Sequence, residues 1–89
     1  MIEIFWDNHF KKAYKKRTQN TPYLKRKLAI AILKFEKNPF EKSLNTHKLS
    51  GSMSEYWSFK VDYNCRIIFK FIDESKVIFY DVGTHDQVY

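Results

Sequence analysis

Three runs of aromatic and β-branched residues fill the last third of this chain, separated by only a few polar residues. The runs are YWSFKVDY (56–63), CRIIFKFI (65–72) and KVIFYDVG (76–83). Residue type and alternation predict three β-strands, and connections this short join only antiparallel neighbours. Because an 89-residue chain forms one domain, here residues 1–89, we expect this meander to be the centre of the fold.

The region before the meander predicts one strand and two helices. The segment IEIFW (2–6) has the residue types of a short strand. Asp7 or Asn8 can cap a helix over 9–18. A second helix is expected to follow, with an apolar stripe at helical spacing formed by Leu24, Leu28, Ala31, Ile32 and Phe35.

Clear signals bound this second helix. Thr21 is expected to be its N-cap and Pro22 its first residue, and Asn38-Pro39 stops it. Residues 40–55 lack periodicity and predict a loop with a short strand near its end. The order βααβββ predicts an α+β domain in which a two-helix hairpin packs on one face of an antiparallel sheet.

Alternate residues of a strand share a face, so the meander has an apolar side that is expected to form the core beneath the helices. We assume a first turn centred on Tyr63 and a second turn that pairs Ile72 with Val77. The apolar side then collects Trp57, Phe59, Val61, Ile67, Phe69, Phe71, Ile78, Tyr80 and Val82.

The other side of the meander, called here the reverse face, carries Lys60 opposite Arg66 and is expected to be uncovered. Two cations directly opposite each other destabilise a sheet pair unless they point into water or hold an anion between them. The same face receives Asp81, Gly83 and, by extension, His85, together with the apolar Ile68, Val77 and Phe79. A face that mixes cations with large apolar groups suits a groove for a partner peptide or a nucleic acid.

The net charge of the chain is +6, and its cations gather in the helical region. No acidic residue lies between Asn8 and Phe35. Such a field attracts polyanions, so we expect nucleic acid or another acidic partner there; a solvated face that aids solubility is the alternative. The candidate RNA-binding residues are Lys11, Lys12, Lys15, Lys16, Arg17, Lys25, Arg26 and Lys27.

The composition also argues against several classes of protein. Cys65 is the only cysteine, so no internal disulfide is expected and the chain is expected to be reduced and cytoplasmic. The start MIEIFWDNHF does not resemble a signal peptide, and no apolar run approaches the ~20 residues of a membrane span. His9, His47 and His85 are not at metal-binding spacing, and no Gly-rich phosphate loop occurs, so neither a metal nor a cofactor is expected. His9, near a helix start, is expected to have no special role.

His47 and His85 combine with Lys60, Arg66 and Tyr89 into the parts that metal-free RNA cleavage requires. A base takes a proton from the ribose 2′-OH, cations stabilise the phosphorane, and an acid protonates the 5′-leaving oxygen. Histidine can serve as either base or acid near neutral pH, and an aromatic ring can stack on an unpaired base. For each histidine alone, an exposed or structural role is the alternative.

Three motifs give the chain a family resemblance. They are HKLSG (47–51), NCRIIF (64–69) and the ending GTHDQVY (83–89), of which the ending is the most specific. Together with the basic helical half, they resemble the RelE/ParE toxin superfamily over roughly the whole chain, most closely the YafQ-like branch of mRNA interferases. The resemblance implies a type II toxin–antitoxin system toxin, a ribosome-dependent endoribonuclease that cuts mRNA in the decoding site and is held inactive by a co-encoded antitoxin.

The resemblance also implies roles for individual residues. His47, His85 and the terminal Tyr89 match functional positions of the YafQ-like branch. Arg66 matches a transition-state cation used in RelE-like members. The basic helices would grip ribosomal RNA.

The central strand departs from the family pattern. Where the YafQ-like branch often carries His and Asp, this chain has Lys60 and Asn64. Lys60 would supply charge, as basic residues do in RelE relatives. Either His47 or His85 would be the base, and the other would be the acid.

Two other functions suit the same fold. One is a ParE-like toxin that poisons DNA gyrase, although ParE-type chains generally lack the paired histidines of THKLSG and GTHDQVY. The other is an inactive binding protein with a toxin fold. The expected partner is an acidic antitoxin that covers the reverse face or the basic helices within a toxin–antitoxin hetero-oligomer.

Overall fold

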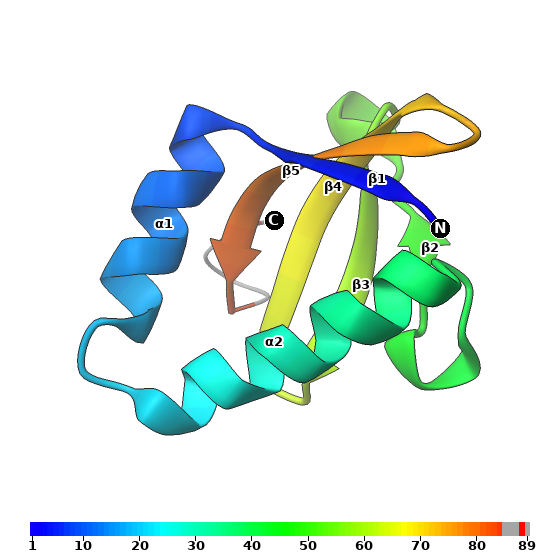
Figure 1. Cartoon of the computed structure of the whole chain (residues 1–89). Coiled ribbons are helices and arrows are strands. Elements are labelled where there is room, and N and C mark those ends of the chain that lie inside the picture. The colour runs from blue at the N-terminus through cyan, green and yellow to red at the C-terminus, as the bar shows by residue number, and fades with distance from the viewer. Residues whose placement is uncertain (85–87, 89) are drawn as a thin grey trace.

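The computed structural model describes residues 1–84 and 88, and Figure 1 shows how their helices and strands are arranged. The helices are α1 (Asn8–Thr18) and α2 (Pro22–Lys37), and the short 3-10 helices are η1 (Lys42–Leu44) and η2 (Gly51–Met53). The strands are β1 (Glu3–Trp6), β2 (His47–Lys48), β3 (Trp57–Asp62), β4 (Cys65–Asp73) and β5 (Lys76–Gly83).

Helix α1 begins at Asn8, one residue before the predicted start at residue 9, and α2 begins at the predicted Pro22. Asp7 caps α1, because its carboxylate accepts a hydrogen bond from the backbone N–H of His9 at 2.7 Å. Pro22 opens α2 directly after Thr21, but the Thr21 side chain makes no capping hydrogen bond, so only the position of this cap was predicted correctly. Within the described part of the chain, no helix is long and apolar enough to cross a membrane.

The sheet confirms the α+β class and the meander, and it adds two features. Its strand order is β1-β5-β4-β3-β2, and β3, β4 and β5 are antiparallel neighbours. The first strand runs parallel to β5, with Glu3 opposite Lys76, so the sheet is mixed. The short strand expected near the end of 40–55 lies earlier, at His47–Lys48, and pairs with the start of β3.

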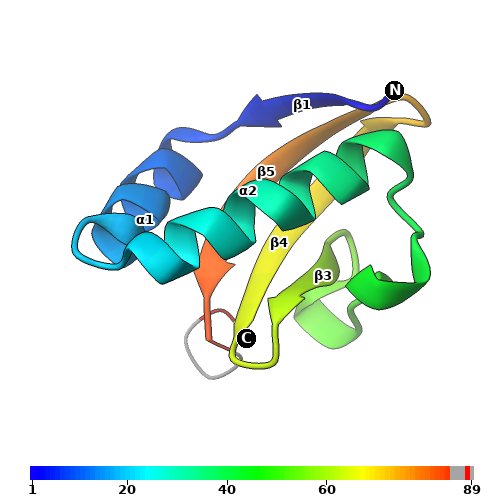
Figure 2. The ribbon, with the colours of Figure 1, turned by 60° about the horizontal axis from the view of Figure 1, so that its bottom comes forward.

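The core lies between the sheet and α2, which crosses one face of the sheet in both views (Figures 1 and 2). Phe35 of α2 stacks on Phe59 with ring centroids 4.5 Å apart, and its ring meets Phe69 and Phe79 at 4.8 and 5.5 Å. These four rings are fully buried, and full burial of a side chain this large stabilises a fold by roughly 1.5–3 kcal/mol. Phe10 adds a buried ring from α1, 5.3 Å from Phe79.

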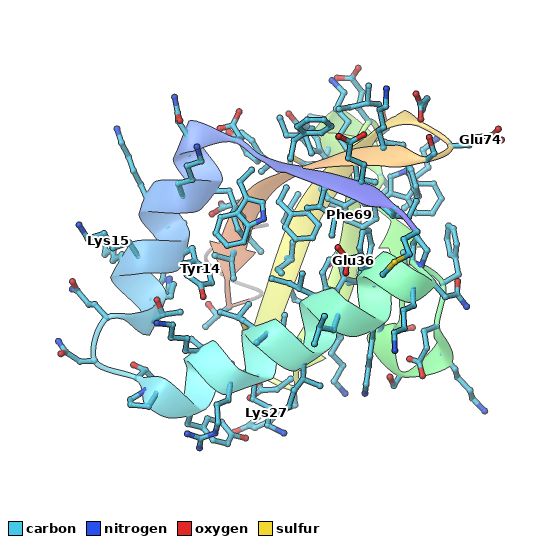
Figure 3. The ribbon with its side chains drawn as sticks, in the orientation of Figure 1. Tyr14, Lys15, Lys27, Glu36, Phe69 and Glu74 are labelled. Atoms are coloured by element: carbon cyan, nitrogen blue, oxygen red, sulfur yellow. The ribbon has the colours of Figure 1, made fainter. Side chains whose placement is uncertain are left out.

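The outer surface of α1 differs from its inner surface in the way that the sequence predicts. Figure 3 shows Tyr14 on the side of α1 that faces the sheet and Lys15 pointing away from it. The Tyr14 ring lies 4.9 Å from Trp6 and 6.1 Å from Phe10. This packing fixes α1 beside β5 and leaves its cations in solvent.

The first half of β5 faces the opposite way from the prediction. Val77 pairs with Phe71, not with Ile72 as assumed. A slip of one residue moves every following side chain to the other face. The exchanged residues are Val77 and Phe79, which lie in the core, and Ile78 and Tyr80, which lie on the reverse face.

A bulge then restores the predicted faces in the second half of β5. Phe79 pairs with Phe69, whereas Asp81 pairs with Ile68. Two steps along β5 therefore match one step along β4, and Tyr80 is the additional residue. Beyond Tyr80 the strand follows the predicted alternation, because two errors of one residue cancel.

The centre of the reverse face is covered, which corrects the expectation of an open side. Ser58 and Ile68 are paired there, and both are 0% exposed. On the same face the ring of Tyr56 lies 5.3 Å from that of Tyr80, and Lys70 Nζ lies 5.9 Å from the centre of the Tyr56 ring. The charged residues of this face therefore surround a covered centre formed by Ser58 and Ile68.

Candidate active site

Two rows of paired residues run across the reverse face. The first row consists of His47, Ser58, Ile68 and Asp81. The second row consists of Lys60, Arg66 and Gly83. Directly paired residues point to the same side of a sheet, so the predicted pairing of Lys60 with Arg66 is confirmed, and His47 shares their face. From the spacing of strands and residues, the Cα atoms of His47 and Arg66 lie about 12 Å apart.

His47 sits on β2 with its side chain exposed. Its Nδ1 lies 2.9 Å from the backbone carbonyl of Asn45. A carbonyl oxygen only accepts hydrogen bonds, so Nδ1 carries the proton in this contact, and Nε2 of the neutral ring keeps its lone pair. Asn45 adopts φ 49 at the end of η1, a left-handed conformation that Asn tolerates. The loop thereby presents His47 in a tautomer that can accept a proton.

An open hollow of about 480 Å³ lies beside His47 and is lined by residues 47–53. Its size falls within the range of about 300–1,000 Å³ that is common for small-molecule sites. Gly51 adopts φ +68 at the turn into η2, where a residue with a Cβ atom would be strained. The loop that was expected to be irregular thus forms one wall of a hollow next to His47.

Lys60 lies near the edge of the sheet, half-buried and beyond the last residue of β3 that pairs with β2. It lines an open hollow of about 690 Å³ together with Glu41, Ser43 and Asn45. The hydrogen bonds from the Ser43 hydroxyl and backbone N–H hold the pKa of Glu41 below its usual value. Lys60 is therefore close to the loop that positions His47, and it shares its hollow with an ionised carboxylate.

Arg66 is fixed by backbone carbonyls. Its Nη1 donates to the carbonyl oxygens of Asp62 at 2.8 Å and Cys65 at 3.2 Å. The backbone N–H of Asn64 donates to Asp62 Oδ1 at 2.8 Å, which closes the same turn. A guanidinium has five N–H donors, so Arg66 can anchor itself in this turn and still present donors to an anion.

A cluster around His9 was missed by sequence reasoning. The His9 ring stacks on Tyr80 with centroids 4.9 Å apart and planes at 9°, and its Nε2 lies 3.4 Å from Asp81 Oδ1. We expected no special role for His9, but in the structure His9 joins α1 to β5. The bulge at Tyr80 creates this contact, and no Gly or Pro in FYDV (79–82) signals the bulge.

The predicted basic residues divide between two surfaces. Lys12, Lys16 and Arg17 of α1 line a hollow of about 370 Å³ that also reaches Asp81 of the reverse face. Lys27 of α2 lies at the lower end of the view in Figure 3. No acidic residue opens either helix, and cations fill the last turn of both, where they interact favourably with the helix dipole.

The predicted residues His85 and Tyr89 lie outside the described part of the chain. Gly83, the last residue of β5, lies opposite Arg66, so the chain leaves the sheet next to this cation. Val88 is buried, and its backbone N–H donates to the Thr84 carbonyl at 3.1 Å. Over 1–84 and 88, no three His, Cys, Asp or Glu side chains lie close enough to hold a metal ion.

The model of the YafQ toxin family, described as a bacterial toxin of a type II toxin–antitoxin system, matches residues 2–89. The chain belongs to this family. The resemblance inferred from the three motifs is thereby confirmed for nearly the whole sequence of this YafQ-family toxin. Among curated proteins, none matches the chain.

Solved structures of other toxins share the fold. YafQ from Escherichia coli BL21(DE3) is 21% identical, with a TM-score of 0.80 over 100% of this chain and 99% of its own. The E. coli DinJ–YafQ complex gives 21% identity and a TM-score of 0.72 over 100% and 99%. A heterotetrameric YoeB–YefM toxin–antitoxin complex from Staphylococcus aureus gives 17% and 0.74 over 96% and 98%.

Proposed function

We propose that this YafQ-family toxin is a ribosome-dependent endoribonuclease that cleaves mRNA without a catalytic metal. The observation that carries the proposal is the shared reverse face, where His47, Lys60 and Arg66 occupy adjacent rows next to the end of β5. This face combines a proton acceptor with two cations. Cleavage of RNA by its own 2′-hydroxyl needs such groups and no hydride or metal chemistry.

His47 is the base in this proposal. The hydrogen bond from its Nδ1 to Asn45 leaves the Nε2 lone pair to take the proton of the ribose 2′-OH. The 2′-oxygen then bonds to phosphorus while the bond from phosphorus to the 5′-oxygen breaks. His85 donates a proton to that leaving oxygen, so the products carry a 2′,3′-cyclic phosphate and a 5′-hydroxyl.

Lys60 and Arg66 stabilise the additional negative charge of the phosphorane. The two carbonyl contacts of Arg66 support this role, because they hold the guanidinium in place before the reaction begins. Tyr89 stacks on a base of the substrate and positions the nucleotide.

The ribosome completes the site in this proposal. The His47 side chain is exposed, and the Cα atoms of His47 and Arg66 lie about 12 Å apart. Free RNA would therefore not hold the reacting atoms near both side chains. The exposed cations of α1 and α2 bind ribosomal RNA and bring the mRNA across the reverse face. Cleavage of free RNA is therefore expected to be weak.

An acidic antitoxin is the proposed inhibitor. The YafQ and YoeB structures in complex with DinJ and YefM support a stable partner chain for a toxin of this fold. Its acidic segment would cover the reverse face or the basic helices and lower their positive potential. If cleavage persists in the saturated complex, inhibition at the site is refuted.

Primer extension on messages from cells that express the toxin tests the proposal. We expect new 5′ ends inside coding regions that vanish with His85→Ala, while the variant folds and no longer arrests growth. Lys76→Ala, an exposed cation at the β4–β5 turn, serves as the control and should cleave normally. Intact transcripts together with gyrase-trapped DNA breaks would instead identify a ParE-like poison.

A further inference from the structure

A pocket of about 270 Å³ opens at the end of the sheet, where the β3–β4 turn and the end of β5 meet the start of α2. In Figure 1 the α1–α2 connection and the β3–β4 turn both lie at the lower end of the molecule. The pocket is lined by residues that include Arg17, Tyr23, Leu24, Asn64, Cys65 and Gly83. The proposed chemistry uses none of these side chains at the reacting phosphate.

The pocket has the surfaces that an aromatic ring system requires. Cys65 is buried and Leu24 half-buried, and they give it an apolar wall. Tyr23 stands at the rim with 54% of its surface exposed, and Lys27 Nζ lies 5.5 Å from the centre of its ring. Unpaired nucleobases bind proteins by stacking on such exposed rings. The volume is slightly below the common range for whole drug-sized ligands, as suits one base.

Asn64 supplies a group that can read a base edge. Its side-chain amide contains both a donor and an acceptor. Its backbone N–H is held by Asp62 Oδ1 at 2.8 Å, and Arg66 Nη1 donates to the Asp62 carbonyl at 2.8 Å. The same small turn therefore carries the proposed transition-state cation and the amide at the pocket rim.

The Asp62 carboxylate lines the pocket and accepts the Asn64 backbone N–H, whereas the cations on either side of the pocket favour a phosphate backbone there. Arg17 lines both this pocket and the hollow that contains Lys12 and Lys16. Gly83 lines the pocket and is paired with Arg66 across the sheet. A strand of RNA whose phosphate meets Arg66 would thus have a flanking phosphate near Arg17 and the intervening base at the pocket.

We infer that this pocket binds one unpaired nucleobase of the mRNA beside the cleaved phosphate, with Tyr23 stacking on the base and Asn64 selecting among the bases. The inference rests on the proposed nuclease function and assigns sequence preference to residues outside its catalytic groups. An antitoxin side chain in the same pocket is the competing occupant.

A binding experiment tests the pocket without cleavage. The full chain, separated from its antitoxin, is titrated with 5′-mononucleotides of the four bases, and ribose 5-phosphate is the control. We expect NMR shift changes at the Tyr23 ring and the Asn64 amide with nucleotides but not with ribose 5-phosphate. Tyr23→Ala should abolish the change at the Asn64 amide, whereas Tyr23→Phe should keep it. Equal shifts with ribose 5-phosphate, or none with any nucleotide, overturn the inference.

A cleavage experiment then tests selection. Messages with randomised codons are translated with purified ribosomes, and cleavage sites are sequenced for the wild type, Asn64→Ala and Tyr63→Ala. Tyr63 belongs to the same turn and is 84% exposed, but it does not line the pocket. Asn64→Ala should reduce discrimination at one base position by about 5- to 150-fold, and Tyr63→Ala should not.

The outcomes separate the two proposals. No cleavage by the wild type refutes the nuclease, and nucleotide binding by the pocket is then judged by the titration alone. Normal cleavage with an unchanged base profile in Asn64→Ala refutes the selective role. If Tyr23→Ala and Asn64→Ala leave cleavage unchanged but weaken inhibition by the antitoxin, the pocket holds the antitoxin, and the inference is wrong.

Discussion

The two faces of the sheet are built from different materials. The helix-facing side carries Phe59, Phe69 and Phe79, which pack ring against ring with Phe35 of α2, and all four rings are 0% exposed. The reverse face has a small covered centre, and its margin carries cations and a histidine. Most of the buried apolar surface that stabilises the fold thus lies on the helix-facing side of the sheet.

This difference predicts that stability and activity can be changed independently. A domain of this size is typically stable by about 5–15 kcal/mol, so one core ring is a large fraction of the total. An exposed residue at the margin of the reverse face contributes little to folding. Substitutions in the core should therefore lower the free energy of unfolding, whereas substitutions at the margin of the reverse face should lower activity and leave stability nearly unchanged.

Phe59→Ala should have the largest effect. Phe59 contacts Phe35, Phe69 and Phe79 with ring centroids 4.5, 5.8 and 5.7 Å apart. Removing a buried ring leaves a cavity and costs about 3–5 kcal/mol. Urea unfolding of the full chain should show this loss. The exposed Ile72, at 56%, is the control, and Ile72→Ala should change the unfolding free energy by less than about 0.5 kcal/mol. Equal losses would break the contrast.

His47→Ala should have the opposite signature. General-base catalysis typically contributes at least about 100-fold to a rate, or roughly 2.7 kcal/mol. We expect mRNA cleavage on purified ribosomes to fall by at least this factor, because the Nε2 acceptor is lost. The unfolding free energy should change by less than about 1 kcal/mol, because the side chain is exposed. A large stability loss would mean that the margin of the reverse face is part of the core.

Sequence reasoning predicted the fold well where the signals are local. The cap at Asp7 and the start of α2 at Pro22 follow from short-range chemistry, and both are present. The predicted pairing of Lys60 with Arg66 is also present, but Asp62 pairs with Cys65, so the assumed turn centred on Tyr63 is wrong and a register shift between Lys60 and Asp62 restores the pairing. The parallel pairing of β1 was not predictable in this way, because it depends on where two helices return the chain.

The faces of β5 show the limit more sharply. The β4–β5 turn has the assumed register, because Asp73 pairs with Lys76, but a register shift between Phe71 and Asp73 reversed Val77 and Phe79, and a bulge at Tyr80 reversed the strand again. Neither register shift has a Gly or Pro signal in KVIFYDVG before its final residue. The predicted positions of Asp81 and Gly83 were therefore correct through the cancellation of two errors, and the contact of His9 with Tyr80 had no basis in the sequence.

Cys65 gives a further test of the difference between the two faces, because it is buried on the core side and the next residue, Arg66, lies on the reverse face. Burial raises the pKa of the Cys65 thiol from 9.0 to about 11, with a further contribution from Asp62. Between pH 9 and 11 the thiol therefore stays protonated in the folded state but is ionised in the unfolded state. The contribution of the protonated thiol to the free energy of unfolding is fully present below pH 9 and is lost between pH 9 and 11, on the order of 2 kcal/mol.

Urea unfolding at several pH values between 8 and 11 measures this loss. Lysines and tyrosines also titrate in this range, so the informative quantity is the difference between the wild type and Cys65→Ala. The wild type should lose stability faster than the variant as the pH rises. Parallel curves would show that the thiol is solvated in the folded state.

The smallest effect is expected for the His9 stack, which lies between the two kinds of surface. Its ring is parallel to Tyr80 at 4.9 Å, but 54% of the His9 side chain is exposed, so we expect a coupling near the low end of the aromatic range, about 0.5 kcal/mol. A double-mutant cycle of His9→Ala and Tyr80→Ala in urea unfolding isolates this coupling from the loss of each ring. His9→Phe is the matched control, because it keeps a ring against Tyr80 and removes the nitrogen that faces Asp81. If His9→Phe is as unstable as His9→Ala, then the contact with Asp81, rather than ring stacking, joins α1 to the bulged half of β5.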